Sequence, residues 1–255
     1  MKKSQLSVEV CFSPALYNFH HNVDKVVVVV DILRATTAIC SAFMNGVSSI
    51  IPIGSADEAR EYKSKGFMVA AERDGLVLDF ADFGNSPYNF TPDRVSGKQI
   101  VYSTTNGTNA IQMASSCYRV GVGAFLNLDA LALWIASLNR EVVILCAGWK
   151  NRFSLEDSVF AGALTDKLIG EYQYDTKCDS VLASLDLWEK ASPNLIVYML
   201  KAAQKARLAA NGLDDVFEYC LTPNLTTIIP VLEHNLLIPF DSKILNGNRI
   251  GAIAK

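Results

Sequence analysis

The chain lacks several features that would place it in a common functional class. No apolar run approaches the roughly 20 residues that cross a bilayer, and the first residues hold no apolar leader core, so we expect a cytoplasmic protein without a membrane partner. The net charge is only −3 over 255 residues. This balance argues against a nucleic-acid partner, because such binding requires a clustered basic excess.

Two kinds of motif are also missing. The six cysteines are scattered without a C-x-x-C pair, so we expect reduced thiols and no structural zinc site. The sequence contains neither a Walker A phosphate loop nor an Asp-x-Asp-x-Thr motif, which excludes P-loop nucleotide chemistry. Aspartyl-phosphate chemistry of the haloacid dehalogenase type is excluded as well.

Three junctions of strand, polar turn and helix are what the sequence does contain. The strands are expected at 25–30, 98–103 and 141–145, and each is rich in apolar, β-branched residues. This order predicts an α/β protein, a three-layer α/β/α fold with a mostly buried mixed sheet. We expect a single unit of two closely packed lobes, about 1–125 and 126–255, with its site where the strands end.

The first junction carries Asp31, Arg34, Thr36 and Thr37 directly after a run of five valines. A charged pair at the end of a buried strand is costly unless it has a use. In open α/β sheets, ligands bind at this position. These residues are therefore predicted to form the first wall of a site for an anion or a metal ion.

The second junction is a turn of small polar residues that opens a helix, namely Thr104, Thr105, Asn106, Gly107 and Thr108. Backbone N–H groups and hydroxyls at such a place make an anion cradle. The alternative is a hydrogen-bonded turn whose threonines only cap the helix.

The third junction brings Cys146 and Gly148, then Arg152, Glu156 and Asp157. Ser154 and Asp157 fit a capping box, an alternative that leaves Arg152 and Glu156 unexplained. Cys146 is a candidate nucleophile if the helix start and Arg152 lower its pKa. The alternative is a packed structural thiol.

Further polar groups lie between the junctions. Glu72 and Arg73 follow a strand expected at 67–71, and the irregular loop 79–92 contains Asp82, Asn85 and Ser86. Carboxylates and arginines together on loops suit Mg²⁺-assisted phosphoryl chemistry, because Mg²⁺ takes one or two carboxylates and guanidinium groups bind phosphate oxygens. Near the end of the chain, Pro230 and Pro239 make 226–240 an expected edge strand or extended tail.

Five segments, in this order, resemble the motifs of the 2-phosphosulfolactate phosphatase family. They are Asp31-Ile-Leu-Arg-Ala-Thr-Thr37, Glu72-Arg73, Asp82-Phe-Gly-Asn-Ser-Pro87, Thr104-Thr-Asn-Gly-Thr108 and the stretch from Cys146-Ala-Gly148 to Phe153-Ser-Leu-Glu-Asp157. The resemblance implies a Mg²⁺-dependent acid phosphatase that converts 2-phosphosulfolactate to 3-sulfolactate and phosphate. It also implies a role in the second step of coenzyme M biosynthesis and an α/β/α fold distinct from the common phosphatase folds.

The predicted site therefore has three overlapping parts. Metal binding is assigned to Asp31, Glu72 and Asp82, and catalysis to Asp31, Arg34, Glu72, Cys146, Glu156 and Asp157. The nucleophile is either metal-bound water or Cys146. Binding of a small phosphorylated anionic substrate is assigned to Arg34, Thr36, Thr37, Arg73, Asn85, Ser86, Thr104, Thr105, Asn106, Gly107, Thr108, Gly148 and Arg152.

One alternative function and one assembly state remain open. The alternative is a non-catalytic binding protein for a small anionic metabolite, although such a protein should avoid several acids in its pocket. The apolar composition also makes a homodimer plausible.

Overall fold

A computed structural model describes residues 6–245. Ten strands form one mixed sheet in the order β1-β8-β2-β7-β9-β10-β3-β6-β4-β5. The strands are β1 (Val8–Cys11), β2 (Val26–Val30), β3 (Ser49–Ile53), β4 (Met68–Arg73), β5 (Leu76–Val77), β6 (Gln99–Ser103), β7 (Arg119–Gly123), β8 (Val142–Cys146), β9 (Ile228–Glu233) and β10 (Leu236–Asp241).

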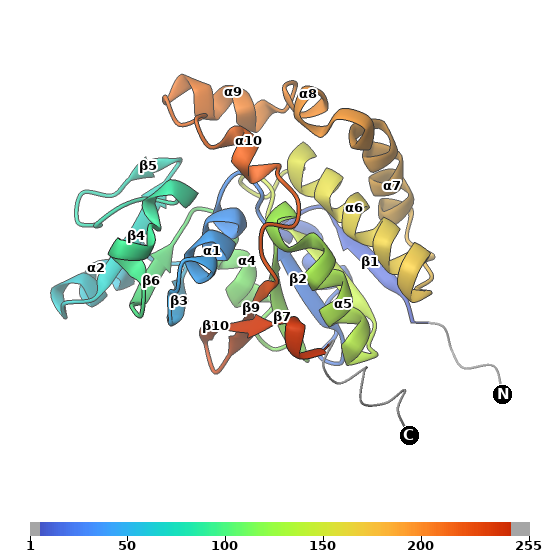
Figure 1. Cartoon of the computed structure of the whole chain (residues 1–255), viewed down its shortest axis with the longest axis horizontal. Helices are drawn as coiled ribbons and strands as arrows, with labels where there is room; N and C mark the ends of the chain where they lie inside the picture. The colour runs from blue at the N-terminus through green and yellow to red at the C-terminus, as the bar shows by residue number, and fades with distance from the viewer. Residues whose placement is uncertain (1–5, 246–255) are drawn as a thin grey trace.

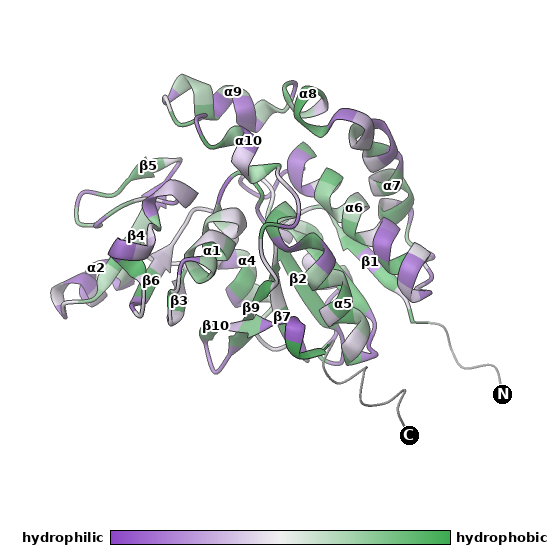
Figure 2. Cartoon of the chain, in the orientation of Figure 1, coloured by the Kyte–Doolittle hydropathy of each residue, from purple (hydrophilic) through white to green (hydrophobic). Residues whose placement is uncertain are grey.

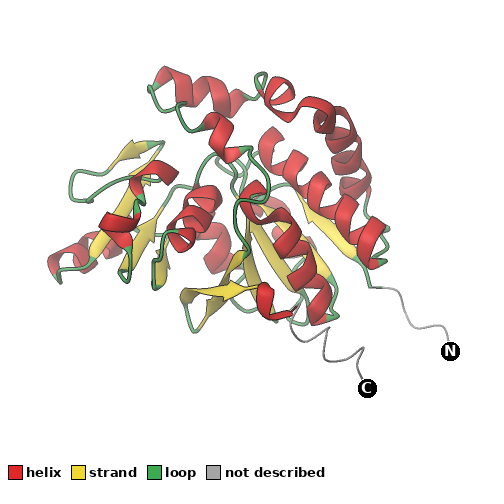
Figure 3. Ribbon diagram, viewed as in Figure 1, coloured by secondary structure: helices red, strands yellow, loops and turns green. Residues whose placement is uncertain are grey.

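Helices cover both faces of the sheet, which confirms the predicted three-layer α/β/α fold (Figure 3). They are α1 (Ala35–Met44), α2 (Ala56–Ser64), α3 (Pro92–Val95), α4 (Gly107–Met113), α5 (Leu128–Leu138), α6 (Leu155–Tyr172), α7 (Asp179–Ala191), α8 (Leu195–Met199), α9 (Ala203–Ala210) and α10 (Phe217–Cys220). In the described part of the chain, none of them has the length and apolar character needed to span a bilayer.

The sheet consists of two parallel blocks, β1-β8-β2-β7 and β3-β6-β4. All five valines of β2 are buried, as expected for a strand with helices on both faces, and Figure 2 shows the hydrophobic colour along it. The division into lobes near residue 125 stays a prediction. Within the sheet, β8 from the second half lies between β1 and β2 from the first.

The prediction for 226–240 was wrong, because this segment joins the two blocks instead of lying at an edge. It forms the hairpin β9–β10, at the lower centre of Figure 1. Pro230 lies opposite Pro239 at a non-hydrogen-bonded position of the hairpin, so their missing N–H groups remove no bond between β9 and β10. The outer pairings avoid both prolines, since β7 pairs at 231 and 232 and β3 pairs at Leu237.

Local signals in the sequence mark the helix ends. α1 ends at Met44, and Gly46 has the positive φ of +89° that suits a glycine after a helix. α2 begins after Ser55, whose hydroxyl accepts a hydrogen bond from the Glu58 amide. These signals position the junctions, and through them the polar residues that follow the strands.

Candidate active site

One small pocket, here called the acidic pocket, gathers residues that follow β2, β4, β6 and β8. It is lined by Asp31, Leu33, Arg34, Glu72, Gly75, Asn85, Asn106, Gly148, Trp149, Glu156, Asp157, Gln204 and Leu208. The free space is about 20 Å³, roughly what one water molecule occupies. The lining groups therefore lie close together.

The first junction contributes Asp31, Leu33 and Arg34 to the lining, and these residues are here called the floor of the pocket. A carboxylate oxygen of Asp31 accepts a hydrogen bond from the Ala35 amide at 3.3 Å, and the other lies beside Gly107. A Cβ on Gly107 would lie 2.7 Å from the Ala35 Cβ and 3.0 Å from Asp31 Oδ2. A glycine at 107 thus allows the second junction to approach Asp31 this closely.

Burial raises the pKa of Asp31 to about 7, and the charges of Glu72 and Glu156 add to this effect. The pKa of Asp157 is raised by burial and by the charge of Glu156, although its carboxylate accepts hydrogen bonds from the amides of Ile32 (2.9 Å) and Gly148 (3.0 Å). Burial also raises the pKa of Glu156. Carboxyl groups from different junctions therefore destabilise one another's charges.

Glu72 lies inside β4 and not after it, and its carboxylate ties three segments together. It accepts hydrogen bonds from the amides of Gly75 (2.6 Å) and Thr105 (2.8 Å). The side chain is only 4% exposed. Oε2 also accepts a hydrogen bond from the Thr105 hydroxyl at 3.3 Å. These bonds fix both carboxylate oxygens, and Oε1 keeps a second lone pair for another partner.

Arg34 is the guanidinium of the pocket floor, only 4% exposed. Its Nη2 donates a hydrogen bond to Asn85 Oδ1 at 2.8 Å. Its Nη1 has no hydrogen-bond partner among residues 6–245. A buried N–H group without a partner is costly, so this donor marks a place for an anionic ligand oxygen. Arg34 and Asn85, both assigned to substrate binding from the sequence, thus meet in this pocket.

Several predicted ligand groups hold the protein together instead. Arg73 donates to the carbonyl oxygens of Glu72 and Gly54 and to the Ser103 hydroxyl, so it ties β4 to its neighbours and does not line the pocket. The hydroxyls of Thr36 and Thr37 bond the amide of Asp31 and the carbonyl of Ile32.

The second junction also divides between the two alternatives. Thr104 and Thr108 bond each other through their hydroxyls and backbone groups, and Thr105 is engaged with Glu72. Of the polar side chains in this turn, only that of Asn106 lines the pocket. Its Oδ1 accepts a hydrogen bond from the Lys150 amide at 3.1 Å. The threonines therefore serve the hydrogen-bonded turn, and Asn106 forms part of the pocket wall.

Asp82 does not reach the other predicted metal ligands. It forms an ion pair with Lys63 at 2.6 Å and accepts a hydrogen bond from the Val69 amide. Ser86 likewise lies outside the pocket lining, where its carbonyl accepts from the Asn89 amide. The sequence placed all three residues on one loop, but it could not show that only Asn85 lines the pocket.

The third junction makes the opposite wall. Gly148 has a φ of +63°, and a Cβ there would lie 2.2 Å from the carbonyl oxygen of Arg152. This tight turn presents the Gly148 amide to Asp157. The Arg152 side chain is exposed and is not among the lining residues. The Asp157 carboxylate accepts from the amides of Ile32 and Gly148, and the Ser154 side chain makes no cap bond. The capping-box alternative was therefore wrong.

Cys146 is a buried, packed thiol. It is 0% exposed, and burial together with the charge of Asp157 raises its pKa well above the ordinary value. A nucleophilic cysteine requires the opposite shift, so the candidate nucleophile of the sequence prediction is not supported by its surroundings.

Sequence reasoning missed the contribution of α9. Gln204 donates a hydrogen bond to the Leu33 carbonyl at 3.0 Å, and Leu208 lines the same pocket. In Figure 1 this helix lies above the strand ends. The C-terminal helices carry no motif, so no local signal pointed to them.

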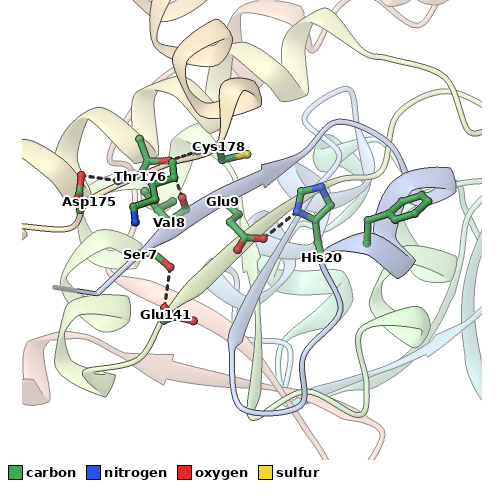
Figure 4. Close-up of a pocket in the computed structure, with 10 residues that line it drawn as sticks. Ser7, Val8, Glu9, His20, Glu141, Asp175, Thr176 and Cys178 are labelled. Atoms are coloured by element: carbon green, nitrogen blue, oxygen red, sulfur yellow. Dashed lines mark hydrogen bonds and ion pairs between the residues drawn. The ribbon is translucent and has the colours of Figure 1, made fainter. Parts of the chain in front are cut away.

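A second, larger hollow of about 600 Å³ lies beside the first residues of β1 and β8 (Figure 4). It is here called the β1 groove. Glu9 contacts His20 at 2.9 Å and Lys25 at 2.6 Å, and Ser7 donates to Glu141. The acids of this groove already have protein partners. Among the described residues, the acidic pocket is therefore the stronger candidate for chemistry.

The fold and this pocket define an α/β protein that holds buried carboxylates and a guanidinium group at the ends of its strands. A family model described as 2-phosphosulpholactate phosphatase matches residues 11–235, and the chain belongs to this family.

Curated relatives agree with this assignment, and each of the following is described as a probable 2-phosphosulfolactate phosphatase. The protein of Caldanaerobacter subterraneus subsp. tengcongensis is 34% identical over 218 residues, which is 84% of this chain and 90% of that one. That of Symbiobacterium thermophilum is 34% identical, covering 84% and 94%. That of Thermotoga maritima is 32% identical, covering 84% and 92%.

Proposed function

We propose that the protein is a phosphoric monoester hydrolase that converts 2-phosphosulfolactate to 3-sulfolactate and phosphate. The observation that carries the proposal is the buried Nη1 of Arg34, which has no partner among the described residues and lies in a pocket with carboxyl groups of raised pKa. Membership of the family supports the substrate. A phosphate oxygen on Arg34 satisfies the orphaned donor.

We further propose that Mg²⁺ takes part. No three His, Cys, Asp or Glu side chains within 6–245 make a ready group of metal ligands, but Mg²⁺ requires only one or two carboxylates and keeps waters. Asp31 and Glu72 fit the role of metal ligands. Burial is the larger cause of the raised pKa of Asp31, and the charge of Glu72 is the next. A cation between the two carboxylates would relieve their repulsion. When bound, the ion would withdraw charge from the phosphoryl group.

The chain's own residues have distinct tasks in this proposal. Arg34 binds the phosphate and offsets the charge that develops on it. The raised pKa of Glu156 suits it to hold or deliver a proton at the oxygen of the leaving group. Asp157 fixes the backbone at Ile32 and Gly148, which keeps the first and third junctions in register.

The alternative of a non-catalytic anion binder fits the pocket less well. Asp31, Glu72, Glu156 and Asp157 all line it, and several acids repel an anion unless they have a catalytic or metal-binding task. Assembly as a homodimer, location in the cytoplasm and a place in coenzyme M biosynthesis remain predictions.

The test is release of phosphate from 2-phosphosulfolactate by the purified protein with Mg²⁺, after EDTA, and after Mg²⁺ is restored. We expect turnover that EDTA abolishes and Mg²⁺ recovers. Turnover that EDTA leaves unchanged would remove the metal from the proposal. Tight binding of the ester without any release, unaffected by Asp31→Asn, would favour the anion binder.

A further inference from the structure

Arg207 of α9 contacts Gln204 and Trp149, two lining residues that are here called the rim of the acidic pocket. Its Nε donates a hydrogen bond to Gln204 Oε1 at 2.6 Å, and its Cζ lies 4.6 Å from the centre of the Trp149 ring. Gln204 and Trp149 both line the pocket, and Gln204 is bonded in turn to the Leu33 carbonyl beside Arg34. The guanidinium is thus held in a defined place by two rim residues.

The two terminal nitrogens of Arg207 remain available. Within 6–245 the structure gives neither Nη1 nor Nη2 a hydrogen-bond partner, and the side chain has no ion-pair partner within 4.0 Å. A stacked, half-buried guanidinium with two open N–H groups is preorganised to bind a carboxylate or sulfonate with both. Burial raises the pKa of Glu156, and the charge of Arg207 partly offsets this, which places Arg207 within electrostatic reach of the pocket.

The other cations near the pocket have other partners or positions. Arg73 bonds backbone and hydroxyl oxygens of β3, β4 and β6. Lys150 pairs with Asp74 at 2.7 Å, and the Arg152 side chain is exposed. Arg207 is not a lining residue either, but it is half-buried and its side chain contacts two residues that are. Arg34 on the floor and Arg207 at the rim are therefore the two guanidinium groups that can share one ligand.

We propose that Arg207 determines substrate specificity by binding a second acid group of the substrate, a carboxylate or sulfonate separate from the phosphate. The inference rests on the proposed function, in which the phosphate lies on Arg34. The substrate then has one anionic group on the floor and another at the rim. This arrangement selects phosphate esters with a second acid over esters without one.

The test compares two secondary phosphate esters, 2-phosphosulfolactate and glycerol 2-phosphate, which lacks both acid groups. For Arg207→Met, which keeps much of the apolar stem, we expect kcat/KM for 2-phosphosulfolactate to fall about 10- to 100-fold, mainly through KM. The value for glycerol 2-phosphate should stay within about twofold. Arg207→Lys should recover part of the loss, because it keeps the charge without the fork.

Lys201→Met is the matched control, because it removes a positive charge from the turn between α8 and α9, where the Lys201 ammonium lies over the Tyr198 ring. This control should resemble the wild-type protein with both esters. An equal loss with both esters in Arg207→Met, or no loss with either, overturns the proposal.

Failure of the proposed function is a separate outcome. If the wild-type protein releases phosphate from neither ester, that function falls, and calorimetric binding of 3-sulfolactate then tests Arg207 alone. Weaker binding by Arg207→Met than by Lys201→Met supports the role of Arg207, and equal binding overturns it.

Discussion

The two hollows of this molecule differ in how their charges are compensated. In the β1 groove, the hydrogen bond from His20 and the ammonium of Lys25 lower the pKa of Glu9 to about 2. In the acidic pocket, burial and neighbouring carboxylates raise the pKa of Asp31 to about 7. The groove is far larger, about 600 Å³ against 20 Å³. Uncompensated charge therefore distinguishes the candidate active site, and volume does not.

Replacing Asp31 with Asn should have the largest effect. We expect kcat/KM to fall at least about 1,000-fold, because the variant loses a proposed metal ligand. Stability should change in the opposite direction. A carboxyl group whose pKa is raised in the folded state destabilises the folded protein increasingly as pH rises from 3.8 toward 7. At about pH 8 in EDTA, the variant should be more stable by on the order of 2 kcal/mol.

Urea unfolding at several pH values measures this difference. The gap between Asp31→Asn and the wild-type protein should close as pH falls below about 3.8, where both the folded and the unfolded chains carry the proton on Asp31. Added Mg²⁺ should stabilise the wild-type protein more than the variant. A variant that is less stable at every pH contradicts the account of uncompensated charge in this pocket.

Gly148→Ala tests the backbone of the same pocket. The added Cβ would lie 2.2 Å from the Arg152 carbonyl oxygen at a φ of +63°, so we expect a loss of about 2–4 kcal/mol in unfolding free energy. Gly170→Ala in α6 is the matched control, since nothing lies within 4 Å of its added Cβ. A neutral or stabilising change is expected there. Equal effects of the two substitutions in denaturant unfolding would contradict the tight turn.

Glu9→Gln addresses the β1 groove. The lowered pKa of Glu9 stabilises the folded protein above about pH 4.5, and this contribution is lost as pH falls toward 2. Because the side chain is partly exposed, the cost of the substitution at neutral pH should be about 1 kcal/mol. Thermal unfolding against pH measures it, with turnover of 2-phosphosulfolactate as the control. A stabilising effect, as expected for Asp31→Asn, would remove the contrast between the two hollows.

Cys146→Ala should have the smallest effect. The thiol is buried with a raised pKa, so we expect kcat within about twofold of the wild-type value and a stability loss of about 1 kcal/mol from the lost packing. Steady-state kinetics of phosphate release distinguishes the possibilities. A loss of several orders of magnitude would restore Cys146 as the nucleophile.

Much of the site could be predicted because its signals are local. Asp31, Glu72, Asn106 and Gly148 each follow or end a strand, and the ends of strands converge in an α/β fold. The threonines and Arg73 could not be assigned from the sequence in the same way. A hydroxyl or a guanidinium at a strand end can bond a ligand or a neighbouring backbone, and only three-dimensional partners decide between the two.

The parts that sequence reasoning missed depend on contacts between distant segments. Gln204 lies 171 positions after its partner Leu33, and Gln204 belongs to no motif. The hairpin β9–β10 was placed at an edge because of its prolines, yet its pairings with β7 and β3 avoid both of them, which makes an interior position possible. Such long-range pairings leave no periodic trace in a single sequence.

The position of the β9–β10 hairpin has a consequence for synthesis of the protein. A ribosome makes β1 to β8 first, yet the two parallel blocks they form have no strand between them until residues 228–241 emerge. The sheet therefore cannot be completed before this hairpin is made, and a nascent chain arrested before residue 228 exposes β7 and β3 as unpaired edges, which are prone to associate with other chains.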